Sequence, residues 1–172
     1  IIETKEIPDL KNNKLYYYLE CKENQKNEDI IKKDIVAISI YTENKLYYIR
    51  ADEEFKEKLK NIFENEKIEK YGYNLAEDYI LLKQIGITMK NIVYDVKVAA
   101  YILNPTSKYT MDVIARDYLE IDNNEFLQTK NESEGKQTSL FDNEQQNLQQ
   151  ENSKKMENCL YAKEVYELAK VT

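Results

Sequence analysis

The hydrophobic pattern of the chain changes its period near residue 51, and this change constrains the possible folds more than any other feature. Before it lie three aromatic or β-branched runs of strand type, with a short turn between the last two: Lys14–Cys21, Asp34–Tyr41 and Lys45–Arg50. After it, apolar residues recur at the spacing of one helical face, at Phe55, Leu59, Ile62 and Phe63. The pattern therefore predicts an antiparallel meander of three strands that leads into a helix.

Strands and helices alternate in the next part of the chain. Strand patterns occur at Ile68–Tyr73 and Asn91–Tyr94, and helical patterns at Leu75–Ile85, Val96–Leu103 and Met111–Tyr118. Such alternation indicates crossover connections and parallel pairing. With the meander, it predicts an α/β fold in which a mixed five-stranded sheet carries helices on both faces. Ligand sites in such sheets lie beyond the carboxyl ends of strands, where Cys21, Tyr73 and Tyr94 are expected.

The segment from Glu120 to Asn158 has a different composition, because Asn and Gln are frequent in it and apolar residues are few. This composition is typical of a long polar loop, which is the structure predicted for residues 120–158. A final helix is expected after it, with Ala162, Val165, Tyr166 and Ala169 on one face. Residues 1–172 are expected to form a single domain that is a piece of a longer protein.

Composition excludes several kinds of chemistry. The 172 residues include two cysteines, Cys21 and Cys159, and no histidine, so neither a disulfide framework nor a zinc site is predicted. The thiols are expected to be buried and reduced, as in a cytoplasmic protein. A nucleophile activated by histidine is excluded. The net charge of −7 argues against strong DNA binding by this domain alone, and no apolar run approaches the ~18 residues of a membrane span.

Asn74 and Asp78 stand four residues apart at the start of a predicted helix, just past a predicted strand. Side chains at this spacing project from the same side of a helix, so the carboxylate can reach the edge of the sheet. In the alternative interpretation Asn74 is an N-cap and Asp78 is a solvated acid of the first turn. The residues alone favour this alternative, because an isolated N-x3-D is a weak motif. Asp95 is expected to cap the following helix.

Three segments in succession carry a family resemblance: YGYNLAEDYILLKQIGI, NIVYDVKVAAYILNP and YTMDVIARDYLE. Their order and spacing resemble the 3′–5′ exonuclease domain of bacterial DNA polymerase I, a family A polymerase. That domain belongs to the DnaQ-like group of the ribonuclease H-like fold. The sequence GKQTSLF, at Gly135–Phe141, is similar to a family loop of the form GKGxxQxxF. The resemblance covers most of the chain and implies a three-layer ribonuclease H-like fold.

Active members of this family hold two divalent metal ions with four carboxylates. These come from a D-x-E on the first strand, the Asp of an N-x3-D, and the Asp of a Y-x3-D on the last helix. Hydrolysis by two metals requires this set, since one ion generates hydroxide while the other stabilises the departing oxygen. The resemblance implies that Asn74 and Asp78 are what remains of the site. Leu19, Cys21 and Tyr161 stand where the other three acids belong, and the site is therefore degenerate.

One acid of four cannot hold two magnesium ions, and groups that act as a unit fail together. The resemblance thus implies a domain without catalytic residues, metal ligands or a cofactor. It would serve as a structural scaffold for the polymerase domain of its parent chain in DNA replication and repair. The isolated domain is expected to be monomeric and cytoplasmic, without membrane contact, and to meet DNA only through the parent protein.

Two alternatives stay open. The first is an active exonuclease dependent on Mg²⁺ or Mn²⁺, whose ligands have moved to Glu20, Glu23, Glu157 or Glu164. Shifting the first strand by one residue would place Glu20 at a ligand position, but on the opposite face of the strand. The second alternative is a binding module without enzymatic activity, which uses the sheet surface or the polar loop region.

Overall fold

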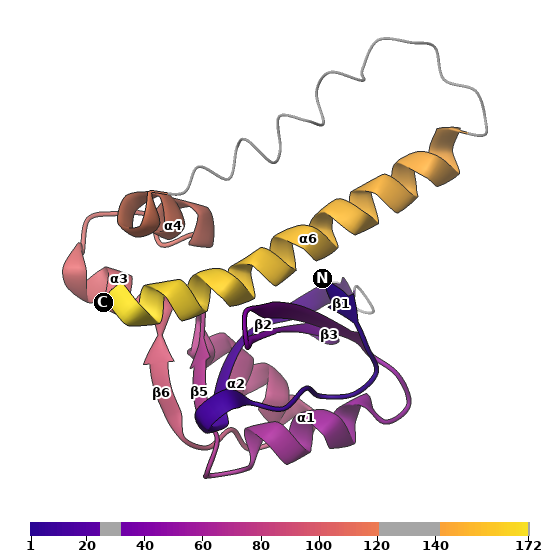
Figure 1. The fold of residues 1–172 in the computed structure, drawn as a ribbon, viewed down its shortest axis with the longest axis horizontal. Coiled ribbons are helices and arrows are strands. Elements are labelled where there is room, and N and C mark those ends of the chain that lie inside the picture. Colours follow the sequence, from indigo (N-terminus) through magenta and orange to yellow (C-terminus); the bar gives the residue numbers. More distant parts are fainter. Residues whose placement is uncertain (25–31, 121–141, 172) are drawn as a thin grey trace.

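The computed structural model describes residues 1–24, 32–120 and 142–171, which form a six-stranded sheet with helices on both faces (Figure 1). The strands are β1 (Ile2–Glu3), β2 (Lys14–Asn24), β3 (Lys32–Thr42), β4 (Lys45–Arg50), β5 (Glu69–Gly72) and β6 (Ile92–Asp95). The helices are the 3-10 turn η1 (Lys11–Asn13), α1 (Phe55–Phe63), α2 (Leu75–Gln84), α3 (Val96–Leu103), α4 (Met111–Leu119) and α6 (Asp142–Val171).

The strands lie in the order β1-β4-β3-β2-β5-β6. Strands β2, β3 and β4 pair as the predicted antiparallel meander, and β5 and β6 add to β2 in parallel. This arrangement confirms the mixed sheet. The predicted count of five strands is wrong by one, because Ile2 and Glu3 pair in parallel with β4. A strand of two residues has no periodicity that a sequence pattern can reveal.

Alternation along β2 divides the interior into two cores. Leu15, Tyr17 and Leu19 face α1 and α2, and all three are buried. Tyr16 and Tyr18 face the opposite way and pack into the core that α3, α4 and α6 share. Helix α6 crosses this second face, whereas α1 and α2 cover the first (Figure 1). The β2 tyrosines are therefore packing residues of a three-layer structure.

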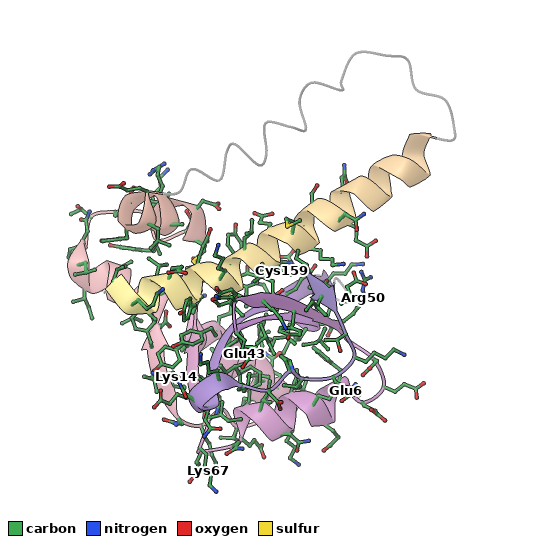
Figure 2. All side chains as sticks on the ribbon, in the orientation of Figure 1. Glu6, Lys14, Glu43, Arg50, Lys67 and Cys159 are labelled. Carbon is green, nitrogen blue, oxygen red and sulfur yellow. The ribbon has the colours of Figure 1, made fainter. Side chains whose placement is uncertain are left out.

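Helix α6 corrects the prediction for residues 120–158. The helix begins at Asp142, so a loop from there to Asn158 is wrong. Gln, Glu and Lys favour helix nearly as well as Leu does, and they extend α6 beyond the point where burial begins at Asn158 and Cys159. Cys159 lies between α6 and the sheet (Figure 2), with its Sγ 3.6 Å from Ser39 Oγ. Residues 121–141, including the GKQTSLF segment, lie outside the described residues.

The start of α2 is fitted closely to the sheet. A Cβ atom at Gly72 would stand 2.5 Å from Leu75 Cδ2 and 3.1 Å from the Tyr17 ring, so only glycine allows this approach. At the other end Gly86 has a φ of +82°, and the Ile87 amide donates to Leu82 O at 2.9 Å. The left-handed Gly86 thus ends α2 at Gln84, within one residue of the predicted bound. None of the helices in the described ranges combines the length and apolar character that a membrane span needs.

Candidate functional site

A pocket of about 240 Å³ opens beside β2, the end of β5 and the first turns of α2. Its lining residues are Tyr18, Leu19, Cys21, Glu23, Lys33, Tyr73, Asn74, Glu77, Asp78 and Leu81. Four of the five residues that the family resemblance singles out line this pocket, namely Leu19, Cys21, Asn74 and Asp78. The fifth, Tyr161, does not. Strand β2 and the start of α2 therefore meet, as expected. Cys21 does not end its strand, because β2 continues to Asn24.

Asn74 stands at the N-cap position of α2 but does not cap the helix with its side chain. It has a left-handed backbone, with φ 58° and ψ 52°, and its Nδ2 donates to Glu77 Oε2 at 2.6 Å. The capping acceptor is Asp95, which accepts from the Asn74 amide at 3.1 Å and from the Leu75 amide at 2.7 Å. The same carboxylate caps α3, as predicted, by accepting from Lys97 N at 2.8 Å. The interpretation of Asn74 as the cap is therefore wrong in its mechanism.

Asp78 is buried, with 9% of its surface exposed, and the interpretation of it as a solvated acid is wrong. The close approach of α2 to the sheet turns its first-turn side chain inward, toward the fully buried Tyr17. Burial raises the pKa of Asp78 to about 8, with further increases from Glu77 and Asp95 and an opposing contribution from Tyr17. Within the described residues the Tyr17 hydroxyl forms no hydrogen bond of good geometry, although it lies close enough to affect Asp78.

Leu19 and Cys21 bring no charge to the pocket. Leu19 is 6% exposed and belongs to the core that α1 and α2 cover. Cys21 is half-buried, and burial, followed by the charge of Asp78, raises the pKa of its thiol to about 11. A neutral thiol is a poor metal ligand. Glu20 lies between them on the opposite face of β2, where it accepts from the Tyr48 hydroxyl at 2.7 Å, so it does not line the pocket.

Tyr161 lies on α6 behind the pocket. Its hydroxyl is 2.7 Å from Glu157 Oε1, one turn earlier on the helix, and 3.0 Å from Asp112 Oδ1 on α4. Burial raises the pKa of Tyr161, and the neighbouring Glu157 raises it further. The ring centroid lies 5.0 Å from that of Tyr18, which lines the pocket. Tyr161 therefore links α6 to α4 and to the wall of the pocket through a neutral phenol.

The side chains present do not match the ligand set of a two-metal site. Within the described residues, no group of three His, Cys, Asp or Glu side chains is placed to hold a metal ion. Glu23 and Glu77 share the pocket with Asp78. Glu77, however, accepts from Lys33 Nζ at 2.5 Å as well as from the Asn74 amide group. A lysine ammonium thus provides a positive charge inside this pocket.

Sequence reasoning missed three residues of the pocket region. Lys33 lies just before the predicted strand Asp34–Tyr41, but it belongs to β3, whose pairing with β2 brings it to the pocket. No local pattern signals such a contact. Glu77 follows Asn74 by three residues, and this helical spacing was a usable signal for their hydrogen bond. Tyr17 is one of three consecutive tyrosines, and only the register of β2 selects it as the partner of Asp78.

Comparison with known proteins assigns the chain to a family. The model for the family described as "DNA polymerase I, ribonuclease H-like domain" matches residues 18–130. No curated protein matches the chain. A structure of the POL domain of Pol1 from M. smegmatis, in complex with DNA primer-template and dNTP, shares 18% identity with a TM-score of 0.58. The match covers 90% of this chain and 23% of the Pol1 chain, so this chain spans less than a quarter of that protein.

Two structures of the EXD2 exonuclease domain also show similarity, each at 12% identity. The domain soaked in Mg and GMP has a TM-score of 0.39, with 98% of this chain and 84% of that chain covered. The domain soaked in Mn has a TM-score of 0.36, with 91% and 72% covered. The family assignment does not depend on these weaker similarities. Because the family model spans more than half of the sequence and the fold agrees with it, the chain belongs to the ribonuclease H-like domain family of DNA polymerase I.

Proposed function

We propose that this domain has lost exonuclease activity and acts as a structural scaffold for the polymerase domain of the same parent chain, in DNA replication and repair in the cytoplasm. One observation carries the proposal. The pocket brings together Leu19, Cys21 and Asp78, which the family resemblance aligns with ligand positions, and only one of these three residues is a carboxylate. DNA is then bound by the parent protein, and the domain by itself is a monomer that needs neither Mg²⁺ nor Mn²⁺.

The chemistry of phosphodiester hydrolysis supports inactivity. Two divalent ions must be held about 3.5–4 Å apart, and magnesium requires oxygen ligands at near-octahedral positions. Leu19 has no donor atom, and the Cys21 thiol is both soft and protonated. The Tyr161 hydroxyl already interacts with Glu157 and Asp112. Groups that act as a unit lose most of the rate when one is removed, and here three are replaced.

An active enzyme with relocated ligands is the second candidate, because Glu23 and Glu77 line the same pocket as Asp78. Against it stands the ion pair that Glu77 forms with Lys33 at 2.5 Å. Glu20 is turned toward Tyr48 on the other face of the sheet. The other proposed ligands lie on α6, where Glu157 is bonded to Tyr161 and Glu164 is 3% exposed.

A nuclease assay separates the two candidates. The purified domain is incubated with an end-labelled single strand and with Mg²⁺ or Mn²⁺, beside Asp78→Asn and beside the triple variant Leu19→Asp, Cys21→Glu, Tyr161→Asp. Circular dichroism confirms that each variant is folded. We expect the natural sequence and Asp78→Asn to release nucleotide at the same background rate. Turnover by the natural sequence that disappears in Asp78→Asn would establish the active enzyme instead.

The third possibility, a binding module, is tested by titrating the domain with a labelled single strand at several salt concentrations. Binding through phosphates weakens steeply as salt rises. We expect no saturable binding by the isolated domain at 50 mM salt or above, in keeping with its net charge of −7. Tight binding with a steep salt dependence would favour the binding module.

A further inference from the structure

Helix α3 has a composition that does not agree with its exposure. Its sequence, VKVAAYIL, is apolar except for Lys97, and helices with so few polar residues are normally buried. Only one side is covered, through Val96 and Ala100, which pack with residues of α4 and α6. The other side is open, with 53% of Val98, 56% of Tyr101 and 71% of Ile102 exposed, and Leu103, at the C-terminal end of the helix, is 55% exposed. The open side of α3 thus has the character of a surface that another molecule covers.

Strand β6, which leads directly into α3, also exposes apolar side chains. It stands last in the strand order, and Ile92 and Val93 are each 48% exposed. From Ile92 to Leu103 the charged residues are Asp95, whose carboxylate is used in capping two helices, and Lys97. We call the exposed apolar set the α3 edge; its members are Ile92, Val93, Val98, Tyr101, Ile102 and Leu103. Exposed apolar side chains on a helix next to an edge strand are typical of an interaction site.

We infer that the α3 edge is the surface on which the polymerase domain of the parent chain docks. This inference rests on the proposed function, and it identifies the contact through which the scaffold acts. The position of α6 indicates that the polymerase domain is the molecule that covers this surface. The last turns of this helix lie against α3, since Leu168 packs in the same core as Val96 and Ala100, and the C-terminal end lies beside α3 (Figure 1).

A domain connected after Val171 would start next to the α3 edge and would meet it at a high effective concentration. Within one chain, domain interfaces of about 600–1,500 Å² are usual, and an apolar helix with an edge strand is a suitable centre for one. The Pol1 chain agrees with such an arrangement, because this fold accounts for 23% of it. The test below also distinguishes the polymerase domain from two other occupants, a second copy of the domain and the chain segment 121–141.

Thiol labelling tests the inference. Val98→Cys reports on the α3 edge, and Met156→Cys is the matched control, since the two native side chains are 53% and 46% exposed. Met156 lies next to Lys155, which is ion-paired with Glu3 of β1, at the opposite edge of the sheet from β6. Each variant is prepared both as the 172-residue domain and as the full-length chain that its gene encodes. Peptide mapping separates these sites from Cys21 and Cys159.

In the 172-residue domain we expect both thiols to react at similar rates. In the full-length chain we expect the rate at residue 98 to fall at least tenfold and the rate at residue 156 to stay within about twofold. Equal rates at residue 98 in the two forms would overturn the inference. Slow labelling in the domain itself would also overturn it, with sedimentation identifying a second copy, or deletion of 121–141 identifying that segment, as the occupant. The nuclease assay on the 172-residue domain tests the proposed loss of activity separately, because its outcome does not depend on what covers the α3 edge.

Discussion

Two aspartates near the pocket have opposite roles, although the sequence presents both simply as acids next to strands. The Asp95 carboxylate accepts hydrogen bonds from backbone amides at the starts of α2 and α3. Asp78 is buried against Tyr17, and burial raises its pKa to about 8. A buried carboxylate without a counterion opposes folding. Under the proposed function Asp78 should therefore be a cost to stability that no metal offsets.

Replacing Asp78 by Asn should stabilise the domain at neutral and mildly alkaline pH. An unfolded Asp has a pKa of about 3.9, so the folded state holds a proton that the unfolded state releases between about pH 4 and pH 8. Stability from this group is therefore present below about pH 4 and is lost as pH rises toward 8. We expect Asp78→Asn to raise the free energy of unfolding by about 1–3 kcal/mol at pH 7.5. Near pH 4 the substitution should change this free energy little.

Urea unfolding at several pH values checks this expectation, with Asp117→Asn as the control. Asp117 is an exposed acid on α4, so its replacement should change the free energy of unfolding by less than about 0.5 kcal/mol at every pH. A loss of stability in Asp78→Asn at pH 7.5 would show that the carboxylate has a favourable partner.

Among the secondary structure elements, the start of α2 depends most on a residue distant in sequence. Asp95 accepts from two amides there, while Asn74 supplies the left-handed backbone. The sequence predicted the position of the helix and the capping of α3 by Asp95. It did not predict the capping of α2, because this contact depends on the pairing of β5 with β6. Long-range contacts of this kind leave no local pattern.

Asp95→Ala should cost more than the loss of a usual cap, since one side chain serves two helices. We expect a loss of about 1–3 kcal/mol in the free energy of unfolding, measured by urea denaturation. Asn74→Gly is the control, because glycine accepts the same backbone angles and the Asn74 side chain does not cap. It should change stability by less than about 1 kcal/mol. A larger loss in Asn74→Gly than in Asp95→Ala would reverse the two roles.

Gly72→Ala should also be destabilising, because the added Cβ would stand 2.5 Å from Leu75 Cδ2. We expect a loss of about 1–3 kcal/mol from overpacking. Shortening the opposing side chain should relieve the overlap, so the double variant Gly72→Ala, Leu75→Ala should lose less than the sum of the single variants. Additive losses in a double-mutant cycle would show that this contact does not set the position of α2.

The other differences between prediction and structure have similar physical causes. Polar residues at the start of α6 favour helix without showing an apolar face, so composition suggested a loop where a helix begins at Asp142. The additional strand β1 is stabilised only by its pairing with β4. In contrast, α1 and the strands of the meander have clear periods, and the sequence predicted them within a few residues of the observed bounds.

For the molecule as a unit, the sequence predicted the layers and the meeting of the first long strand with the start of α2, because strand order determines which residues meet at a sheet edge. Leu19, Cys21, Asn74 and Asp78 do line one pocket. The electrostatics of the pocket could not be predicted in this way. The ion pair of Lys33 with Glu77 and the burial of Asp78 depend on packing between elements that are far apart in the chain.

Calorimetric titration of the domain with Mn²⁺ tests most directly whether this site can still hold metal. The variants are Asp78→Asn and the triple variant in which acids stand at positions 19, 21 and 161, and both are checked for folding first. For the natural sequence we predict no saturable heat at millimolar Mn²⁺ and no difference from Asp78→Asn, whereas the folded triple variant should bind. Stoichiometric binding of Mn²⁺ by the natural sequence that is abolished in Asp78→Asn would contradict the loss of the nuclease site.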